Sequence, residues 1–181
     1  MSEDNDVEHL NHSINQRHIS AERLLAWLSD KQVSFTLHHH PPLHSVEDAQ
    51  ELRGDLGGAY VKNLFLKDRS GELFLLTCLS HQTVNLQWLR REIGCRRLSF
   101  VKPDQLWSML GVRPGSISPF ALINAPKGSL IFLADEEIKH HDLSNFHPLS
   151  NEMTVQIKLD DWVALVENWG FTPSWIRFNQ K

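Results

Sequence analysis

Apolar residues recur with the spacing of secondary structure from about Ser20 onward. Between Leu24 and Leu28 they follow a helical period, which predicts a helix that Ser20 caps and that ends near Asp30. Val33–His38 then alternates between apolar and polar residues, as a half-buried strand does. The pattern therefore begins with a helix followed by a strand.

Two longer apolar segments follow, separated by a short polar turn. Tyr60–Leu66 and Leu73–Leu79 are rich in residues that favour strands, and Asp68–Gly71 has the composition of a turn. These segments predict a β-hairpin. Ahead of the hairpin, Ser45 is suited to cap a short helix that runs through Leu52.

Proline and glycine divide the second half of the chain into shorter elements. Pro103 suits the first position of a helix and Gly111 its end. The pattern predicts helices over Val84–Ile93, Pro103–Leu110 and Asp160–Asn168, and strands over Arg97–Val101, Phe120–Asn124, Ser129–Ala134 and Met153–Leu159.

Strands and helices are interspersed without a regular βαβ rhythm. This order favours an α+β (mixed α/β) fold, a single compact domain with a mixed, mostly antiparallel central sheet surrounded by helices. A chain of 181 residues with 41% hydrophobic composition has room for one sizeable core. We expect a domain over residues 20–178 and a flexible acidic tail over residues 1–19, which lack periodic apolar positions.

By sequence criteria we expect neither a membrane span nor a secretory leader. No run of about 18 apolar residues occurs, and the first residues are acidic and polar. We therefore expect a cytoplasmic protein without a membrane partner. Cys78 and Cys95 are too few for a disulfide framework, and Cys78 lies in an apolar strand as a small buried thiol would.

The net charge of −4 argues against a protein that coats nucleic acid indiscriminately. Residues 62–102 nevertheless contain eight basic residues and three acidic ones. This local excess indicates either an ordinary solvated face or a patch that meets phosphates. The candidate phosphate-binding residues in it are Arg90, Arg91, Arg96 and Arg97.

Three separated segments carry the candidate chemistry. Lys62 heads an apolar strand, where a charge is costly unless it meets a negative group such as phosphate or an oxyanion. The loop Gly115–Pro119 is either a tight connection or a loop that turns backbone groups toward a ligand. His40 and His147 each precede a proline, which restricts where the imidazole can lie.

Eleven histidines suggest a metal, but their arrangement argues against one. Neighbouring residues on a strand point to opposite faces, so His38, His39 and His40 are poorly placed to bind one ion together. HExxH, paired CxxC, GxSxG and glycine-rich phosphate loops are all absent. We expect no metal and no cofactor.

Taken together, the motifs resemble those of the prolyl-tRNA editing family. This family comprises freestanding deacylases of the ProX/YbaK type and is similar to the editing domain inserted in bacterial prolyl-tRNA synthetases. The resemblance covers about Ser20 to Ile176. It rests on the His40-Pro41 segment with Ser45-Val46-Glu47, on Gly58 through Lys62-Asn63-Leu64-Phe65-Leu66-Lys67-Asp68, on Pro114-Gly115-Ser116-Ile117-Ser118-Pro119-Phe120, and on His147-Pro148-Leu149-Ser150-Asn151 with Thr154.

The resemblance implies hydrolysis of the ester that joins a wrong amino acid to the 3′ adenosine of tRNA(Pro), and the branch it fits best removes alanine. It implies binding of the tRNA(Pro) acceptor end, with prolyl-tRNA synthetase as a further candidate partner. Ser45 stands where many members have threonine. The implied catalytic residues are Lys62, Asn63 and His147, and the implied substrate-binding residues are His40, Ser45, Gly115, Ser116, Ile117, Ser118 and Pro119.

These residue types suit an ester that is already activated. Such an enzyme positions water, stabilises the oxyanion and excludes the correct amino acid. Lys62 would meet phosphate or developing charge, the loop would accept hydrogen bonds from the ammonium group, and Asn63 and His147 would orient the ester or water. Within the family, the terminal ribose hydroxyl is proposed to activate the water. A noncatalytic module for tRNA or aminoacyl-adenosine, and a deacylase for serine or cysteine, remain alternatives.

Overall fold

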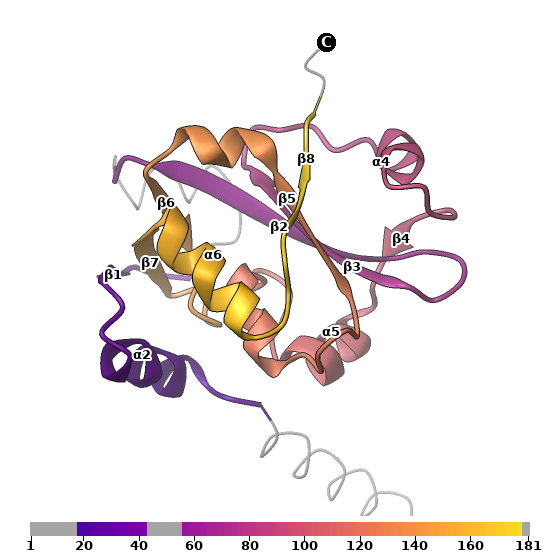
Figure 1. Ribbon diagram of the computed structural model, residues 1–181. Helices are drawn as coiled ribbons and strands as arrows, with labels where there is room; N and C mark the ends of the chain where they lie inside the picture. The colour runs from indigo at the N-terminus through magenta and orange to yellow at the C-terminus, as the bar shows by residue number, and fades with distance from the viewer. Residues whose placement is uncertain (1–17, 43–55, 179–181) are drawn as a thin grey trace, which may run out of the picture.

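A mixed eight-stranded sheet forms the centre of the computed structural model, which describes residues 18–42 and 56–178 (Figure 1). Seven strands follow the order β1-β7-β6-β2-β3-β5-β8, and β4 pairs with β2 beside them. The strands are β1 (Phe35–His39), β2 (Ala59–Lys67), β3 (Leu73–Leu79), β4 (Ser99–Phe100), β5 (Ile131–Asp135), β6 (Leu143–Phe146), β7 (Met153–Lys158) and β8 (Ser174–Ile176).

The pairing of these strands confirms the predicted fold class. The pairs β1–β7, β6–β7, β2–β3 and β2–β4 are antiparallel. The pairs β2–β6, β3–β5 and β5–β8 are parallel. The sheet is therefore mixed and mostly antiparallel, as the irregular order of elements indicated.

The helices are α2 (Ala21–Asp30), α4 (Leu86–Glu92), α5 (Pro103–Leu110) and α6 (Leu159–Asn168), with 3₁₀ helices η1 (Pro119–Asn124) and η2 (Glu136–His140). The predicted caps are confirmed. The hydroxyl of Ser20 accepts a hydrogen bond from the Arg23 amide at 3.4 Å, and Gly111 ends α5 with a φ of 64°.

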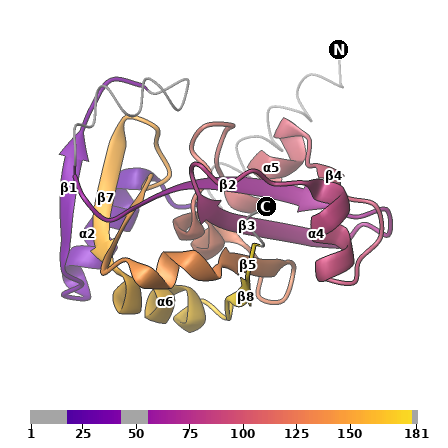
Figure 2. The same ribbon diagram turned by 90° about the horizontal axis from the view of Figure 1, so that it is seen from above.

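Two apolar clusters lie against the sheet. The larger one contains buried residues of α2, α5 and α6, among them Trp162, whose indole packs edge-on against Phe132 and Phe146. The smaller one joins Leu89 of α4 to strands β2, β3 and β5. Figure 2 shows β1 and β7 at one end of the molecule and α4 and β4 at the other.

The predicted strand at Phe120–Asn124 is wrong, because this segment forms η1. Ser118 is extended and Pro119 occupies the first helical position, which pre-sets the φ angle of a helical turn. Phe120, Ala121 and Leu122 are all buried. A short apolar run with burial on every side does not distinguish a strand from a helical turn.

Short elements with polar residues escaped prediction. They are β6, β8 and η2. β6 lies inside the sheet although its sequence is Leu-Ser-Asn-Phe, because the buried side chain of Asn145 donates hydrogen bonds to the carbonyls of Gly57 and Ala59 at 2.9 and 3.2 Å. A buried polar residue that has hydrogen-bond partners lowers the apolar content of a strand, so composition alone does not identify the strand.

Several expectations fall on residues outside the described ranges. They include the tail up to residue 17 and the short helix from Ser45 to Leu52. Ile19 lies just inside the described part, and its amide donates to the Asn124 side chain at 2.9 Å. None of the described helices has the length and apolar character needed to cross a membrane.

Asp68 ties the turn of the β2–β3 hairpin to the arginine-bearing segment before β4. One carboxylate oxygen accepts from the Ser70 hydroxyl at 2.6 Å and amide at 2.7 Å and from the Glu72 amide at 3.1 Å. The other accepts from the Arg96 amide at 3.2 Å. The hydrogen bond from the Ser70 hydroxyl is the main cause that lowers the pKa of Asp68, and the amide bonds add to it. Desolvation acts in the opposite direction and raises this pKa.

We predict that Asp68→Asn destabilises the fold at neutral pH but not in acid. The lowered pKa means that the carboxylate stabilises the native state above the unfolded value of about 4, and that this stabilisation is lost as the pH falls through the native pKa. Asparagine would also present an NH₂ group to one of the donors. Urea midpoints should differ at pH 7 and converge at pH 3.

Asp30→Asn is the matched control, because Asp30 is exposed at the end of α2. It should leave the urea midpoint close to the wild-type value at both pH values. A pH-independent difference between Asp68→Asn and the wild-type protein would contradict the role given to the carboxylate charge.

Candidate active site

The loop between α5 and η1 has a defined turn. The Ser116 amide donates to the Arg113 carbonyl at 3.0 Å, and Gly115 has a φ of 93°, a conformation that side-chain-bearing residues rarely adopt. A Cβ atom on Gly115 would lie 3.8 Å from the side-chain nitrogen of Asn151. The loop Gly115–Pro119 therefore lies beside the turn that follows His147.

Asn63 joins this loop to the central sheet. Its side-chain NH₂ group donates to the Ile117 carbonyl at 2.8 Å, and its side-chain oxygen accepts from the Thr77 hydroxyl at 2.7 Å. Thr77 lies directly opposite Asn63 on β3 and is fully buried. Both ends of the Asn63 amide are thus engaged by the protein itself.

His40 and His147 form a pair where β1 and β7 meet the end of β6. Their ring centroids are 5.8 Å apart. Nδ1 of His147 lies 2.8 Å from the Met153 carbonyl, and Nε2 of His40 lies 2.9 Å from the Thr154 hydroxyl. Because a carbonyl only accepts, Nδ1 of His147 carries a hydrogen and donates it to Met153.

Lys62 lies on the opposite face of β2 from Asn63, since successive side chains of a strand alternate. It is half-buried and directly opposite Cys78 on β3. Burial raises the pKa of the Cys78 thiol to about 12, and the positive charge of Lys62 opposes this rise. Cys78 is therefore the buried, unreactive thiol that the sequence predicted.

One edge of β2 is unpaired in its middle among the described strands. On the side away from β3, β2 pairs with β6 at Ala59 and Tyr60 and with β4 at Leu66 and Lys67. Within residues 18–42 and 56–178, no strand pairs with β2 between these two contacts. Lys62 and Asn63 both border this edge, one from each face.

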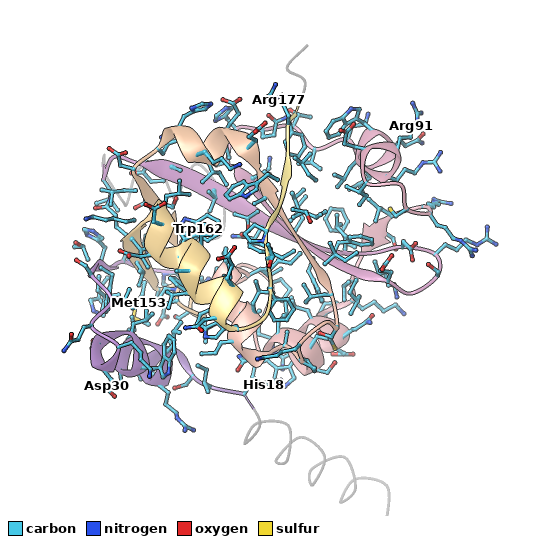
Figure 3. All side chains as sticks on the ribbon, viewed as in Figure 1. His18, Asp30, Arg91, Met153, Trp162 and Arg177 are labelled. Atoms are coloured by element: carbon cyan, nitrogen blue, oxygen red, sulfur yellow. The ribbon has the colours of Figure 1, made fainter. Side chains whose placement is uncertain are left out.

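The four arginines lie away from the histidine pair. Arg90 and Arg91 belong to α4, and Arg96 and Arg97 follow it. Figure 3 places Arg91 at one end of the molecule and Met153, the partner of His147, near the other. The structure thus brings the loop, Asn63, His40 and His147 close together, and leaves the arginines in a separate region. Ser45 lies outside the described residues.

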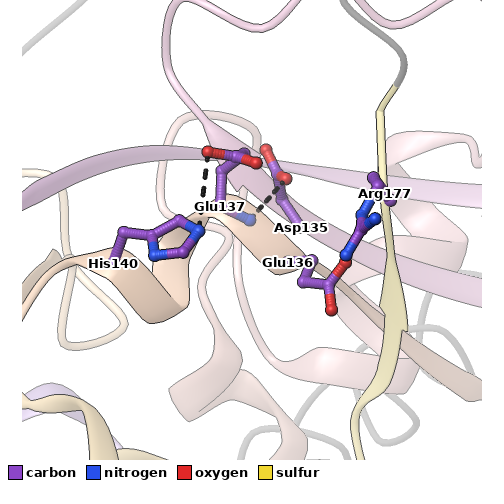
Figure 4. A network of polar contacts seen from close by, with 5 residues as sticks. All are labelled: Asp135, Glu136, Glu137, His140 and Arg177. Atoms are coloured by element: carbon purple, nitrogen blue, oxygen red, sulfur yellow. Dashed lines mark hydrogen bonds and ion pairs between the residues drawn. The ribbon is translucent and has the colours of Figure 1, made fainter.

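A buried carboxylate elsewhere has a structural role. Asp135 at the end of β5 accepts a hydrogen bond from the amide of Glu137 at 3.1 Å (Figure 4). It accepts a second one from the amide of Leu79 at 3.3 Å. Burial raises its pKa, and these bonds oppose the rise. Beside it, an exposed ion pair of 2.8 Å between Glu136 and Arg177 connects η2 to the end of β8.

No cluster of metal-binding side chains is present among the described residues: three His, Cys, Asp or Glu side chains suitable for one ion are nowhere grouped there. His38 and His39 of β1 follow the alternation of a strand, as the sequence indicated.

The structure adds Thr77 to the site region and shows the surroundings of Ser118, which the sequence had already singled out. Thr77 is the single strongly polar residue in the strand Leu-Phe-Leu-Leu-Thr-Cys-Leu, which was a signal in the sequence that we did not use. Ser118 is fully buried, and within the described part of the chain its hydroxyl has no hydrogen-bond partner. Such a group is costly unless a ligand or water satisfies it.

Residues 40–165 match the profile of the aminoacyl-tRNA editing domain, and the chain belongs to this family. It is 28% identical over 152 residues to the prolyl-tRNA editing protein ProX of Acetoanaerobium sticklandii, covering 83% of this chain and 93% of that protein. It is 30% identical over 146 residues to the prolyl-tRNA synthetase associated domain-containing protein 1 of Bos taurus, covering 78% and 85%.

Solved structures share the fold. A crystal structure described as that of a candidate trans-editing enzyme for prolyl tRNA synthetase superimposes with a TM-score of 0.69 at 15% identity, covering 91% of this chain and all of that one. The resemblance to the prolyl-tRNA editing family seen in the motifs is thus confirmed by the family profile, a curated relative and the fold.

Proposed function

We propose that this protein is a trans-editing deacylase that hydrolyses mischarged tRNA(Pro), with alanine as the amino acid removed. One observation carries the proposal. The loop Gly115–Pro119, held by Asn63, lies beside the turn that follows His147, so the three motifs of the editing family converge from distant parts of the sequence. Membership of the aminoacyl-tRNA editing domain family supports the same class of reaction.

The loop would bind the amino acid. The carbonyls of Gly115 and Ser116 accept no hydrogen bond from the described residues, and the Ser118 hydroxyl is buried without a described partner. An ammonium group is a donor and needs acceptors of this kind. The Ile117 carbonyl, by contrast, already accepts from Asn63. Asn63 therefore acts on the loop, rather than on the ester or the water as the sequence had suggested.

His147, whose ring is held by the contact of Nδ1 with the Met153 carbonyl, would orient the water or the terminal ribose hydroxyl. Lys62 would meet the terminal phosphate or the developing oxyanion at the open edge of β2. An aminoacyl ester is reactive enough that positioning and charge stabilisation supply most of the catalysis. We propose that the reaction requires no metal.

Exclusion of proline by size would give selectivity. A missing methylene in an apolar pocket changes binding by only about 1–3 kcal/mol, so a site that selects alanine over proline is best built to reject the larger ring. Serine and cysteine esters are the competing small substrates. A noncatalytic module that binds aminoacyl-adenosine is the second candidate, favoured by relatives named only as synthetase-associated proteins.

We predict that the purified protein deacylates alanyl-tRNA(Pro) at least about 100-fold faster than prolyl-tRNA(Pro), because steric rejection of a ring exceeds the effect of one methylene. The rate should be unchanged by a chelator. Release of labelled amino acid under single-turnover conditions measures both rates, with seryl- and cysteinyl-tRNA(Pro) as competing substrates.

Each part of this proposal has its own contrary result. Equal rates on the alanyl and prolyl esters would contradict size exclusion. Activity lost in chelator and restored only by added zinc would contradict the metal-free reaction. Tight binding of alanyl-tRNA(Pro) without hydrolysis would favour the noncatalytic module.

We predict that Lys62→Ala lowers kcat/KM by about 100-fold or more, the range for loss of one group that stabilises an oxyanion. Lys62 is half-buried at a strand edge and not part of either apolar cluster, so the melting temperature should change little. Lys158→Ala at the exposed end of β7 is the matched control and should retain wild-type activity. Near-normal single-turnover hydrolysis by Lys62→Ala would remove this lysine from the site.

We also propose that the arginines of α4 and of the segment after it contact tRNA phosphates. We expect two double variants, Arg90→Ala with Arg91→Ala and Arg96→Ala with Arg97→Ala, to bind more weakly. The loss should be similar for cognate and non-cognate tRNA. Each pair should reduce the slope of log binding constant against log salt by about 2. Unchanged binding in both double variants, measured by filter binding, would mean that these arginines form an ordinary solvated surface.

A further inference from the structure

Thr77 connects the core of the sheet to the substrate loop Gly115–Pro119 through the side chain of Asn63. Its hydroxyl donates to Asn63 at 2.7 Å, and Asn63 donates to the Ile117 carbonyl at 2.8 Å. Thr77 is fully buried on β3 and lies opposite Asn63 in register, whereas Ile117 belongs to a loop more than fifty residues away in sequence from Asn63. The two bonds form a continuous link from β3 to the loop.

The order of donors and acceptors along this link is determined. The Ile117 carbonyl only accepts, so the NH₂ group of Asn63 must face the loop. The side-chain oxygen of Asn63 then faces β3, where it needs a donor. The Thr77 hydroxyl is the donor that the structure provides. Without this second bond, only the bond to Ile117 would hold the amide. Because χ2 of asparagine has a broad energy minimum, the amide could then rotate more easily.

Rotation of the amide would release the loop. The bond from Asn63 is the side-chain hydrogen bond described between β2 and residues 115–119. The remaining hydrogen bonds of the loop run within it or to its neighbours in sequence. Loss of a 2.8 Å contact would let the carbonyls of Gly115 and Ser116 move relative to His147. Displacements of about 1 Å from a productive geometry are enough to cost about 100-fold in rate.

We infer that Thr77 is a positioning residue of the active site, which orients the Asn63 amide and thereby holds the substrate loop. Thr77 itself is enclosed in the core and does not touch the substrate. This inference rests on the proposed deacylase function for its kinetic effect, whereas the effect on the loop is independent of it.

The test compares Thr77→Val, which removes the hydroxyl and keeps the shape, with Thr77→Ser, which keeps the hydroxyl. On alanyl-tRNA(Pro), Thr77→Val should lose about 10- to 100-fold in kcat/KM. Thr77→Ser should stay within a few-fold of wild type, roughly the spread expected when the hydrogen bond is retained. Thr77→Cys has a weaker donor of similar size and should fall between them, which provides a second variant if valine impairs folding.

A double-variant cycle distinguishes positioning from general destabilisation. If Thr77 acts through Asn63, Thr77→Val should cause no further loss in an Asn63→Ala background. Ser144→Ala is the matched control, because Ser144 is also fully buried in the sheet and its hydroxyl has no partner among the described residues. This control should retain wild-type activity.

Hydrogen exchange of residues 113–118, followed by mass spectrometry on substrate-free protein, gives a readout that needs no catalysis. Thr77→Val and Asn63→Ala should accelerate exchange in this segment equally, and Thr77→Ser should not. If wild-type protein does not hydrolyse the ester, the proposed function fails while this measurement still decides the role of Thr77. Wild-type loop exchange in Thr77→Val, or losses that multiply in the double variant, would overturn the inference.

Discussion

The parallel pairing of β2 with β6 joins the two halves of the sheet, and the candidate site depends on it. Ala59 and Tyr60 lie beside Ser144 and Asn145. Gly58 makes this approach possible, since a Cβ atom there would lie 2.6 Å from the Leu143 carbonyl. Asn145 strengthens the junction by donating to two carbonyls at the start of β2. The pairing places His147 directly after the strand that flanks β2.

The site built on this junction combines a rigid part and an open part. The rigid part consists of the Thr77–Asn63–Ile117 link and the histidine pair, whose rings are held by backbone carbonyls and the Thr154 hydroxyl. The open part is the edge of β2 that the described strands leave unpaired. Preorganised groups around a vacant strand edge suit an enzyme that positions an activated ester instead of attacking it with a nucleophile.

The arginine-bearing region and the candidate active site lie apart in the structure. Arg91 lies on α4, whereas Met153, which contacts His147, lies toward the other end of the molecule (Figures 2 and 3). A tRNA whose 3′ end reached the loop could extend its phosphates along β2 toward these arginines. Contacts of this kind would contribute affinity without discriminating between tRNAs.

Local patterns in the sequence determined most of the elements and the identity of the chemical motifs. The apolar strands β2 and β3 and the capped helices α2 and α5 follow from periodicity, proline and glycine, because these act over a few residues. Only the tertiary structure decided that Phe120–Asn124 forms a helical turn, that the polar segment Leu143–Phe146 is a central strand, and that Asn63 serves the loop. Each of these depends on partners distant in sequence, and hydrogen bonds between such partners leave no periodic signal in the chain.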